Sequence, residues 1–362
     1  MIGLLTLQYA DNYGAVLQAY ALQKKIGDLG YACEYINFFP NPRAAVRVSK
    51  PAALFRRALR LLHPIKLKRV LHRRNAFAAF RKKHLHISGK IYRGDSAMHV
   101  FFPYDGYIVG SDQVWNFKIT NASKAYLLDF VPKGIRKSSY ASSFGLSNLG
   151  DEKTLFGELL SSFDDLSVRE ATGADIINDI TGRKAVRCLD PTMLLKRSEW
   201  SAVAAAEPSS QKYVLIYAMT DTPSLVSAAR TAAKKLSCKK IISIGLKKSY
   251  RGISALNSAS PEQWLGCIMN AEAVITNSFH GTAFSIVFQR NFFIEYLPET
   301  WEVNSRLKDI VSLLKLEERI VANGCIQNVQ IPNYDEINIL LDAEREKSIE
   351  YLKGVCSHYD KN

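Results

Sequence analysis

The sequence lacks the short motifs by which metal and nucleotide sites are usually recognised. It contains no HExxH, no CxxC pair, no Walker loop and no GxGxxG. Zinc hydrolases, zinc ribbons, P-loop NTPases and dinucleotide-binding enzymes each depend on one of these patterns. We therefore expect no metal ion and no bound cofactor.

Long apolar runs are also missing, and none approaches the length needed to cross a bilayer. The first residues, Met1–Leu7, lack the basic n-region and the small-residue cleavage site of a signal peptide, and they predict a buried strand. We expect a cytoplasmic protein that is soluble, or at most peripheral on the inner membrane face.

The six cysteines are isolated from one another, at positions 33, 188, 238, 267, 325 and 356. Several of them stand in apolar stretches. This usage predicts reduced core residues in a reducing compartment, and it argues against disulfides and metal ligands.

Acidic residues are absent between Arg43 and Lys83, where fourteen lysines and arginines gather. The rest of the chain balances 34 basic against 34 acidic residues, so the net charge of +14 belongs to this basic insertion, residues 43–83. Because the excess positive charge is confined to one segment, we expect it to serve a function of that segment and not to be a property of the whole protein. We expect no nucleic-acid partner, because the insertion has few aromatic residues and no nucleic-acid-binding motif.

Apolar residues alternate with the arginines of the basic insertion, which predicts a basic amphipathic helix pair. Helices of this kind bind anionic membrane surfaces, with roughly 1 kcal/mol for each basic residue near the bilayer. We expect the insertion to bind such a surface. The alternative is a solvated basic face whose apolar side belongs to the core.

Strand-like and helix-like segments alternate along the chain, and the alternation restarts near residue 212. This pattern predicts parallel sheets covered by helices on both faces. We expect an α/β protein with two Rossmann-like, doubly wound domains that face a cleft, where ligands bind at the carboxyl ends of the strands. The predicted domains are 1–203, with the basic insertion, and 204–333, followed by a C-terminal helical segment, 334–362, that can pack back on the first half.

One motif, Asn277–Thr282, falls where a buried strand ends and a helix begins. His280 is presented there beside free helix N–H groups, where it can transfer a proton near neutral pH. Gly281 permits a close backbone approach, and Thr282 can supply the N-cap oxygen. A purely structural histidine is the alternative.

Four other polar segments stand at similar strand ends or helix starts. The turn that contains Asn12 and Gly14 can bind a phosphate or a sugar hydroxyl, or simply cap a helix. Arg169 can hold a carboxylate or a phosphate, or pair with Glu170. Asp112 lies in a polar loop, and Arg306 opens a helix, where it can also be a surface residue.

Together, the ordered segments Asn12–Gln23, Gly110–Asn116, Ser167–Glu170, Asp190–Thr192 and Ser278–Gly281 resemble the polysaccharide pyruvyl transferase family. The resemblance implies a two-domain fold like that of GT-B glycosyltransferases, with the acceptor on the N-terminal domain and the donor on the C-terminal domain. It also implies transfer of pyruvate from phosphoenolpyruvate to two hydroxyls of a sugar, which forms a cyclic ketal and releases phosphate.

By this resemblance, His280 is the general acid and Arg169 anchors the donor. Basic residues near position 300 are sparse, so Arg306 is the main candidate for a second anchor, and Ser278, Gly281, Asn12 and Gly14 complete the predicted donor site. Asp112 and Asp11 are candidates for the base that activates the attacking hydroxyl. The basic insertion suggests a lipid-linked oligosaccharide as the acceptor.

Two other functions remain open at this point. The same fold serves nucleotide-sugar glycosyltransferases, because a fold does not determine a function. A non-catalytic protein that binds membranes through the basic insertion is the third hypothesis. The sequence predicts no particular acceptor sugar and no oligomeric state.

Overall fold

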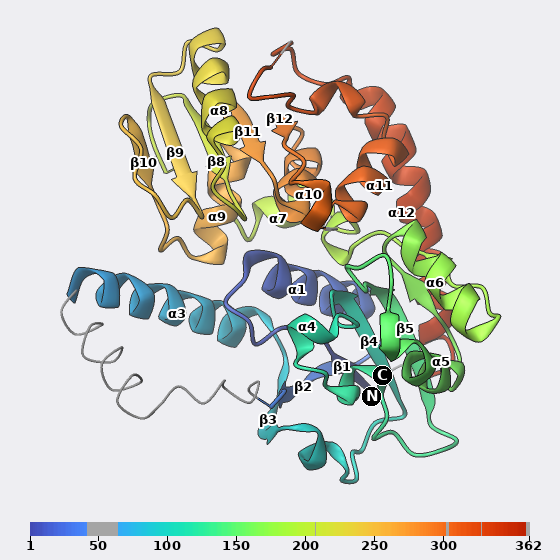
Figure 1. The fold of residues 1–362 in the computed structure, drawn as a ribbon. Coiled ribbons are helices and arrows are strands. Elements are labelled where there is room, and N and C mark those ends of the chain that lie inside the picture. The colour runs from blue at the N-terminus through green and yellow to red at the C-terminus, as the bar shows by residue number, and fades with distance from the viewer. Residues whose placement is uncertain (42–63, 207, 302–303, 327, 360–362) are drawn as a thin grey trace.

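The computed structural model describes residues 1–41, 64–206, 208–301, 304–326 and 328–359. Its strands form two separate parallel sheets (Figure 1), one from residues 2–187 and one from residues 213–294. Much of the predicted basic insertion, residues 42–63, lies outside the described residues.

The first sheet has seven strands in the order β3-β2-β1-β4-β5-β6-β7. All its pairings are parallel. Its strands are β1 Ile2–Leu5, β2 Cys33–Phe39, β3 Ile87–Arg93, β4 Gly106–Asp112, β5 Arg136–Ser142, β6 Ser167–Val168 and β7 Val186–Arg187. Its helices are α1 Tyr13–Asp28, α3 Pro64–His84, α4 Phe117–Thr120, α5 Lys153–Ser161 and α6 Ala171–Thr181.

The second sheet has five parallel strands in the order β10-β9-β8-β11-β12. Its strands are β8 Tyr213–Tyr217, β9 Lys240–Ile244, β10 Ile253–Ala255, β11 Ala273–Thr276 and β12 Asn291–Ile294. The helices of this half are α8 Pro223–Lys235, α9 Pro261–Met269, α10 Phe279–Val287 and α11 Ser305–Leu313, with α7 Arg197–Ser201 between the sheets in sequence.

Alternate residues of the central strands belong to different core clusters. In β8, Tyr213 and Leu215 pack in one cluster, whereas Val214 and Ile216 pack with α8 in another. In β1, Leu4 and Leu5 are divided in the same way. Strands buried on both faces are typical of doubly wound α/β folds. The predicted pair of Rossmann-like domains is confirmed.

Both sheets reverse their strand order at the same place, beside the first strand of each. β1 lies between β2 and β4, and β8 lies between β9 and β11. In open α/β sheets, ligands bind at such switch points, outside the carboxyl ends of the strands. The segments that follow β1, β4, β8 and β11 are therefore the first place to look for a site.

The two halves share a continuous apolar core. One buried cluster includes residues from both sheets, among them Ile2, Leu4, Tyr213 and Leu215. At its centre, the Tyr13 ring of α1 stacks on Trp264 of α9, with ring centroids 5.2 Å apart. Such an extensive apolar contact fixes the orientation of the two sheets.

The helix α12, Tyr334–Cys356, runs from the second half back to the first (Figure 1). Its Ser348 hydroxyl accepts a hydrogen bond from the Leu189 N–H, and its Tyr351 hydroxyl donates one to the Ser139 carbonyl. Leu352 is fully buried in the core cluster that the halves share. The helix therefore ties the end of the chain to the first sheet.

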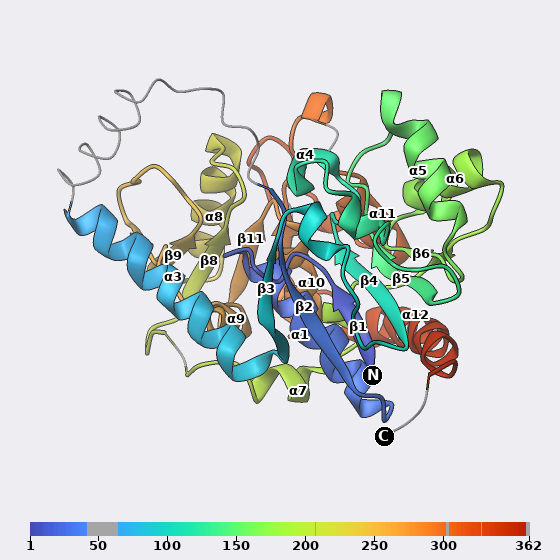
Figure 2. The same cartoon turned by 90° about the horizontal axis from the view of Figure 1, so that it is seen from below.

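In the basic insertion, the described residues form one helix, α3, which extends along one side of the molecule (Figure 2). Phe77 and Phe80 are fully buried in the shared core. Arg73 donates hydrogen bonds to the Tyr13 hydroxyl, the Asp11 carbonyl and the Asn257 carbonyl. This part of the insertion is thus a structural brace between the halves as well as a basic surface.

The six cysteines are all unpaired, and only Cys325 is exposed. Burial raises the pKa of the Cys188, Cys267 and Cys356 thiols to about 12, which keeps them protonated at neutral pH. Within the described residues, no group of His, Cys, Asp and Glu side chains is arranged to hold a metal ion. No helix among those residues is both long enough and apolar enough to span a membrane.

Candidate active site

A cavity of about 370 Å³ lies between the two halves, where the carboxyl ends of the switch-point strands meet. Ordinary ligand pockets have volumes of about 300–1,000 Å³. Segments from both halves line the cavity: the β1–α1 turn, the end of β4, the turns after β8 and β11, and the start of α11. Several of the predicted site residues are among those lining it: Asn12, Asp112, Ser278, His280 and Arg306.

His280 lies in the first turn of α10, which begins at Phe279 and not at the predicted Thr282. The Ser278 hydroxyl accepts the capping hydrogen bond from Gly281 N–H, while Thr282 instead donates to the Ser278 carbonyl. The predicted N-cap at Thr282 is wrong, because α10 already begins at Phe279 and Ser278 is its N-cap. As a result, His280 is held by helix geometry and is only 7% exposed.

Gly14 packs directly against the His280 ring. A Cβ atom built at position 14 would lie 2.1 Å from His280 Nδ1. Asn12 caps α1 by accepting a hydrogen bond from Ala15 N–H, which sets the direction of this helix. The role of Gly14 is therefore to let the N-terminal half approach the imidazole closely, whereas Asn12 both caps a helix and lines the cavity.

Asp190 is the carboxylate around which the site is assembled, and it was not among the predicted site residues. It is buried and accepts hydrogen bonds from the Ser111 hydroxyl, from Thr192 N–H and from the Thr192 hydroxyl. Its Oδ2 lies 2.6 Å from Arg169 Nη1 and 3.7 Å from His280 Nε2. The Asp190–Thr192 motif was the sequence signal for it, but motif order alone does not show what a carboxylate contacts.

The charge of Asp190 persists despite its burial. Desolvation by itself would raise the pKa of this carboxyl, but His280, Arg169 and Thr192 outweigh it and hold the pKa well below its ordinary value. Asp190 is therefore ionised at neutral pH. Its negative charge is available to an imidazolium at His280, whose buried Nε2 has no hydrogen-bond partner among the described residues.

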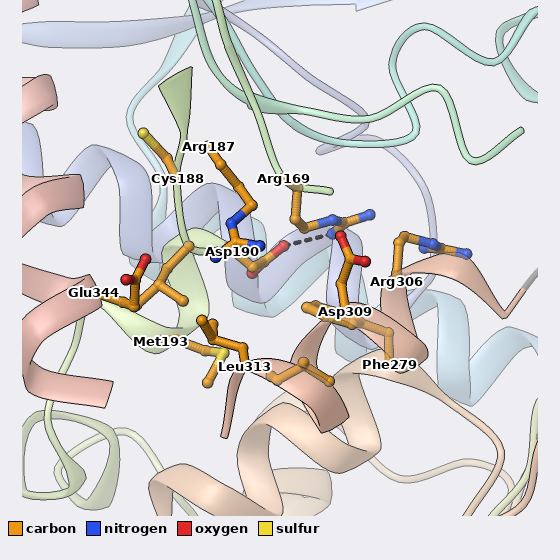
Figure 3. Close-up of a pocket in the computed structure, with 12 residues that line it drawn as sticks. Arg169, Arg187, Cys188, Asp190, Met193, Phe279, Arg306, Asp309, Leu313 and Glu344 are labelled. Atoms are coloured by element: carbon orange, nitrogen blue, oxygen red, sulfur yellow. Dashed lines mark hydrogen bonds and ion pairs between the residues drawn. The ribbon is translucent and has the colours of Figure 1, made fainter. Parts of the chain in front are cut away.

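Arg169 follows β6 and is surrounded by carboxylates. Besides Asp190, its guanidinium lies 3.7 Å from Asp112 and 3.8 Å from Glu170, and it stacks over the Phe279 ring at 4.7 Å. Figure 3 shows Arg169 joined to Asp190 beside a second, smaller cavity of about 30 Å³. The expected alternative, an ion pair with Glu170, is present, and Nη2 remains without a hydrogen bond in the described structure.

Arg306 enters the site from the other half, in the first turn of α11 (Figure 3). It lines both cavities, so the alternative prediction, that Arg306 is a surface residue, is wrong. Asp309, three residues further on, accepts a hydrogen bond from Ala171 N–H at the start of α6. This contact anchors the first turn of α11 to the N-terminal half, and Arg306 with it.

Among the described residues, the Arg306 guanidinium has no hydrogen bond and no ion pair, and its Nε atom is buried. Burial and the neighbouring Arg169 lower the pKa of Arg306. An arginine stays charged in proteins, and a partly buried charge without a partner is costly. An anion bound in the cavity would therefore stabilise this guanidinium.

The structure distinguishes between the two candidates for the base, Asp112 and Asp11. Asp112 lines the cavity, and its backbone has a φ of 62°, a conformation that L-residues adopt rarely. Asp11 does not line it, and its carboxylate pairs with Arg81 at 2.9 Å. The geometry therefore favours Asp112.

Gly281 does not face the cavity. A Cβ at this position would meet Thr276 Oγ1 at 2.4 Å and the Tyr217 ring at 2.8 Å, so this glycine allows α10 to pack on β11 and β8. Its N–H already donates to Ser278. The structure therefore places Gly281 behind the site and not among the groups that can contact a donor.

Comparison with solved structures supports the fold. Arabidopsis thaliana UGT89C1, solved in complex with UDP-L-rhamnose, superposes with a TM-score of 0.50 at 10% identity, over 97% of each chain. S. aureus MnaA, solved with UDP, gives a TM-score of 0.49 at 9% identity, over 97% of this chain and 90% of that one. At such low identity, the likeness to UGT89C1 shows a fold of the GT-B type alone. A search of curated proteins found no match.

A family model extends over most of the chain. The model described as polysaccharide pyruvyl transferase matches residues 12–295, which include His280, Asp190, Arg169 and Asp112 and end just beyond β12. This match agrees with the motif resemblance and with the paired α/β sheets. The chain belongs to the polysaccharide pyruvyl transferase family.

Proposed function

We propose that this protein transfers pyruvate from phosphoenolpyruvate to two hydroxyls of a sugar in a polysaccharide precursor, with His280 as the general acid. The observation that carries the proposal is that a buried histidine and an unpartnered arginine, His280 and Arg306, line one cavity, while the ionised carboxylate of Asp190 lies 3.7 Å behind the imidazole. Membership in the family supports pyruvyl transfer as the reaction.

Phosphoenolpyruvate is a small dianion or trianion. Arg306 of the second half lines the large cavity, whereas Arg169 of the first half lines the smaller cavity, which shares Phe279 and Arg306 with the large one. Arg306 has no partner in the described structure, so it is the stronger donor anchor. Arg169 is already neutralised by three carboxylates and can contribute its Nη2, which lies 3.7 Å from Asp112 and makes no hydrogen bond in the described structure. A guanidinium suits both carboxylate and phosphate because its planar fork matches their oxygens.

The reaction starts with a proton transfer from His280 to the methylene carbon of phosphoenolpyruvate, which becomes a methyl group. One sugar hydroxyl adds to C2 and gives up its proton to a base, for which Asp112 is our candidate. The second hydroxyl then attacks C2, the C–O bond to phosphate breaks, and the ring closes. Its proton leaves with the phosphate, so one cyclic ketal and one phosphate are formed.

Asp190 has a positioning role in this scheme. It is ionised, lies 3.7 Å from His280 Nε2 and holds Arg169 on its other side. A carboxylate at that distance orients the imidazole and complements the positive charge that the ring carries when it donates the proton. No metal ion takes part in this scheme.

We further propose that the acceptor is lipid-linked and that the enzyme acts in the cytoplasm, on the inner membrane face. The described part of α3 supports this: Arg74 is exposed, and the exposed apolar side chains of Val70 and Leu71 lie one turn before it on the same helix face. Basic and apolar groups on one surface are the pattern of interfacial helices. Co-sedimentation with anionic but not neutral vesicles is the expected result, and equal recovery would contradict the electrostatic mechanism.

A donor screen tests the enzymatic proposal. We expect phosphoenolpyruvate to raise the melting temperature and UDP- or GDP-sugars to leave it unchanged. With an acceptor glycan present, phosphate release should require phosphoenolpyruvate. Stabilisation by nucleotide sugars alone would instead support a glycosyltransferase.

The variant His280→Ala tests the acid. Positioned acid catalysis contributes about 10²–10⁴-fold, so we expect phosphate release to fall by at least that lower factor. The variant should still be stabilised by phosphoenolpyruvate, because Arg306 and Arg169 remain. Full activity in this variant would remove His280 from the mechanism.

A further inference from the structure

Three apolar side chains lie at the mouth of the active-site cavity and have no role in the proposed chemistry. Trp301 is 50% exposed, Met219 is 50% exposed and Ile119 is 42% exposed, and all three line the cavity. His280, by contrast, is buried at the same cavity. The cavity therefore has a polar, cationic inner part and an apolar outer rim.

Trp301 is unusual among the tryptophans of the chain. The other three, Trp115, Trp200 and Trp264, are fully buried. An indole has a large apolar face that is normally removed from water, so a half-exposed one beside a cavity indicates a ligand surface.

The rim is made by both halves of the molecule. Ile119 belongs to α4 of the first half, whereas Met219 follows β8 and Trp301 follows β12 in the second. In Figure 2, α4 and the orange turn that carries Trp301 lie at the same side of the molecule. Met219 is fixed in place because its N–H donates to the Asn277 side chain, which also bonds to the Thr220 carbonyl.

The cavity is also larger than the donor requires. At about 370 Å³ it has the size of pockets that hold drug-sized ligands, whereas phosphoenolpyruvate has only three carbons and one phosphate. Neutral hydrogen-bonding groups line the rest of it, among them Asn12, Gln113 and Thr220. Hydroxyl groups are the natural partners of such side chains.

We propose that Trp301, Met219 and Ile119 form an acceptor subsite, in which the apolar face of a pyranose ring stacks on the Trp301 indole. This inference rests on the proposed function and names the part of the site that binds the sugar. A pyranose presents C–H groups on its faces and hydroxyls at its edge. Stacking on the rim turns those hydroxyls toward Asn12, Gln113 and Asp112, and toward C2 of a donor held by Arg306.

The test uses the exposure of Trp301 and needs no turnover. The probes are methyl β-D-galactopyranoside, methyl β-D-glucopyranoside and methyl α-D-mannopyranoside, with sorbitol at equal concentration as the control for viscosity. We expect at least one pyranoside to protect the protein fluorescence from acrylamide quenching, and sorbitol not to. In Trp301→Phe, the fraction of fluorescence that acrylamide reaches should fall and the protection should disappear.

Steady-state kinetics with a productive acceptor give the second readout. Trp301→Ala should raise the acceptor KM at least tenfold, change the phosphoenolpyruvate KM less than twofold, and be partly rescued by Trp301→Phe. Phe101→Ala is the matched control, because Phe101 is an 88%-exposed aromatic residue that does not line the cavity.

Two outcomes would overturn the subsite. One is no protection by any of the three pyranosides, and the other is protection by uridine monophosphate alone, which would assign the indole to a nucleobase. A wild-type protein that binds pyranosides at Trp301 but releases no phosphate from phosphoenolpyruvate would instead contradict the proposed function and leave the sugar subsite standing.

Discussion

At the scale of single residues, the contact between Gly14 and His280 leaves no space for a side chain at position 14. We expect Gly14→Ala to displace the imidazole, because the new methyl group would lie 2.1 Å from Nδ1. Displacement of a catalytic group by about 1 Å costs roughly 10²-fold in rate. Phosphate release in the presence of phosphoenolpyruvate and acceptor measures this loss.

Gly27→Ala is the matched control for that variant. Gly27 lies in the same helix, and a Cβ there would have nothing within 4 Å. It should keep full activity and gain up to about 1 kcal/mol from better helix propensity. Equal activity of the two variants would show that the close approach at Gly14 is not needed.

Asp190 should link stability to pH. The pKa of its carboxyl is lowered in the folded protein, so its contribution is present above the ordinary pKa of about 4 and is lost as pH falls below it. At pH 7, Asp190→Asn leaves Arg169 buried with a partner removed, which costs about 3–5 kcal/mol. Urea unfolding at several pH values should show this difference shrink in acid.

Asp179→Asn provides the comparison, because Asp179 forms an exposed ion pair with Lys153. Its effect should be within about 0.5 kcal/mol at every pH. A destabilisation by Asp190→Asn that stayed constant down to pH 3 would mean that the carboxylate charge is not what stabilises this centre.

Several residues of the candidate site could be proposed from the sequence, but the ion pairs between them could not. His280, Arg306 and Asp112 could be proposed because each stands at a strand end or a helix start, where a doubly wound fold collects its ligands. The contact between Arg169 and Asp190 could not, because these residues are separated by β7 and meet only in the folded sheet.

At the scale of elements, two neighbouring arginines of α3 differ in what they contact. Arg73 makes three hydrogen bonds that join the halves and lies over the Tyr13 ring, whereas Arg74 is exposed. Arg73→Ala should lower the free energy of unfolding by about 1–3 kcal/mol. Arg74→Ala should change it by no more than about 0.5 kcal/mol.

The measurement is chemical denaturation of both variants beside the wild type. Equal effects would show that α3 does not brace the two halves. The sequence predicted a basic amphipathic helix pair in this insertion. It could not show which arginines face inward, because the partners of Arg73 come from the β1–α1 turn, from the start of α1 and from the segment before α9.

The positions at which helices begin were also only partly predictable from the sequence. The C-terminal helical segment predicted over 334–362 agrees with α12, which is long and buries only some of its residues. The start of α10 was placed three residues late because Phe, His and Gly are weak helix formers. Their helical conformation is imposed by the Ser278 cap and by burial of the whole turn.

At the scale of the whole molecule, the shared core predicts cooperative unfolding. Tyr13 stacks on Trp264 across the two halves, and α12 returns to the first sheet. We expect a single transition in which tryptophan fluorescence and far-ultraviolet circular dichroism coincide. Two separated transitions would show that the halves are independent domains and that the cleft can open freely.

Formation of a pyruvyl ketal on the acceptor glycan tests the proposed reaction most directly. Mass spectrometry of the glycan after incubation with phosphoenolpyruvate should show the gain of a pyruvyl ketal, with one phosphate released for each ketal formed. His280→Ala should show neither product. Phosphate release without a ketal, or a sugar added from a nucleotide donor, would contradict the account.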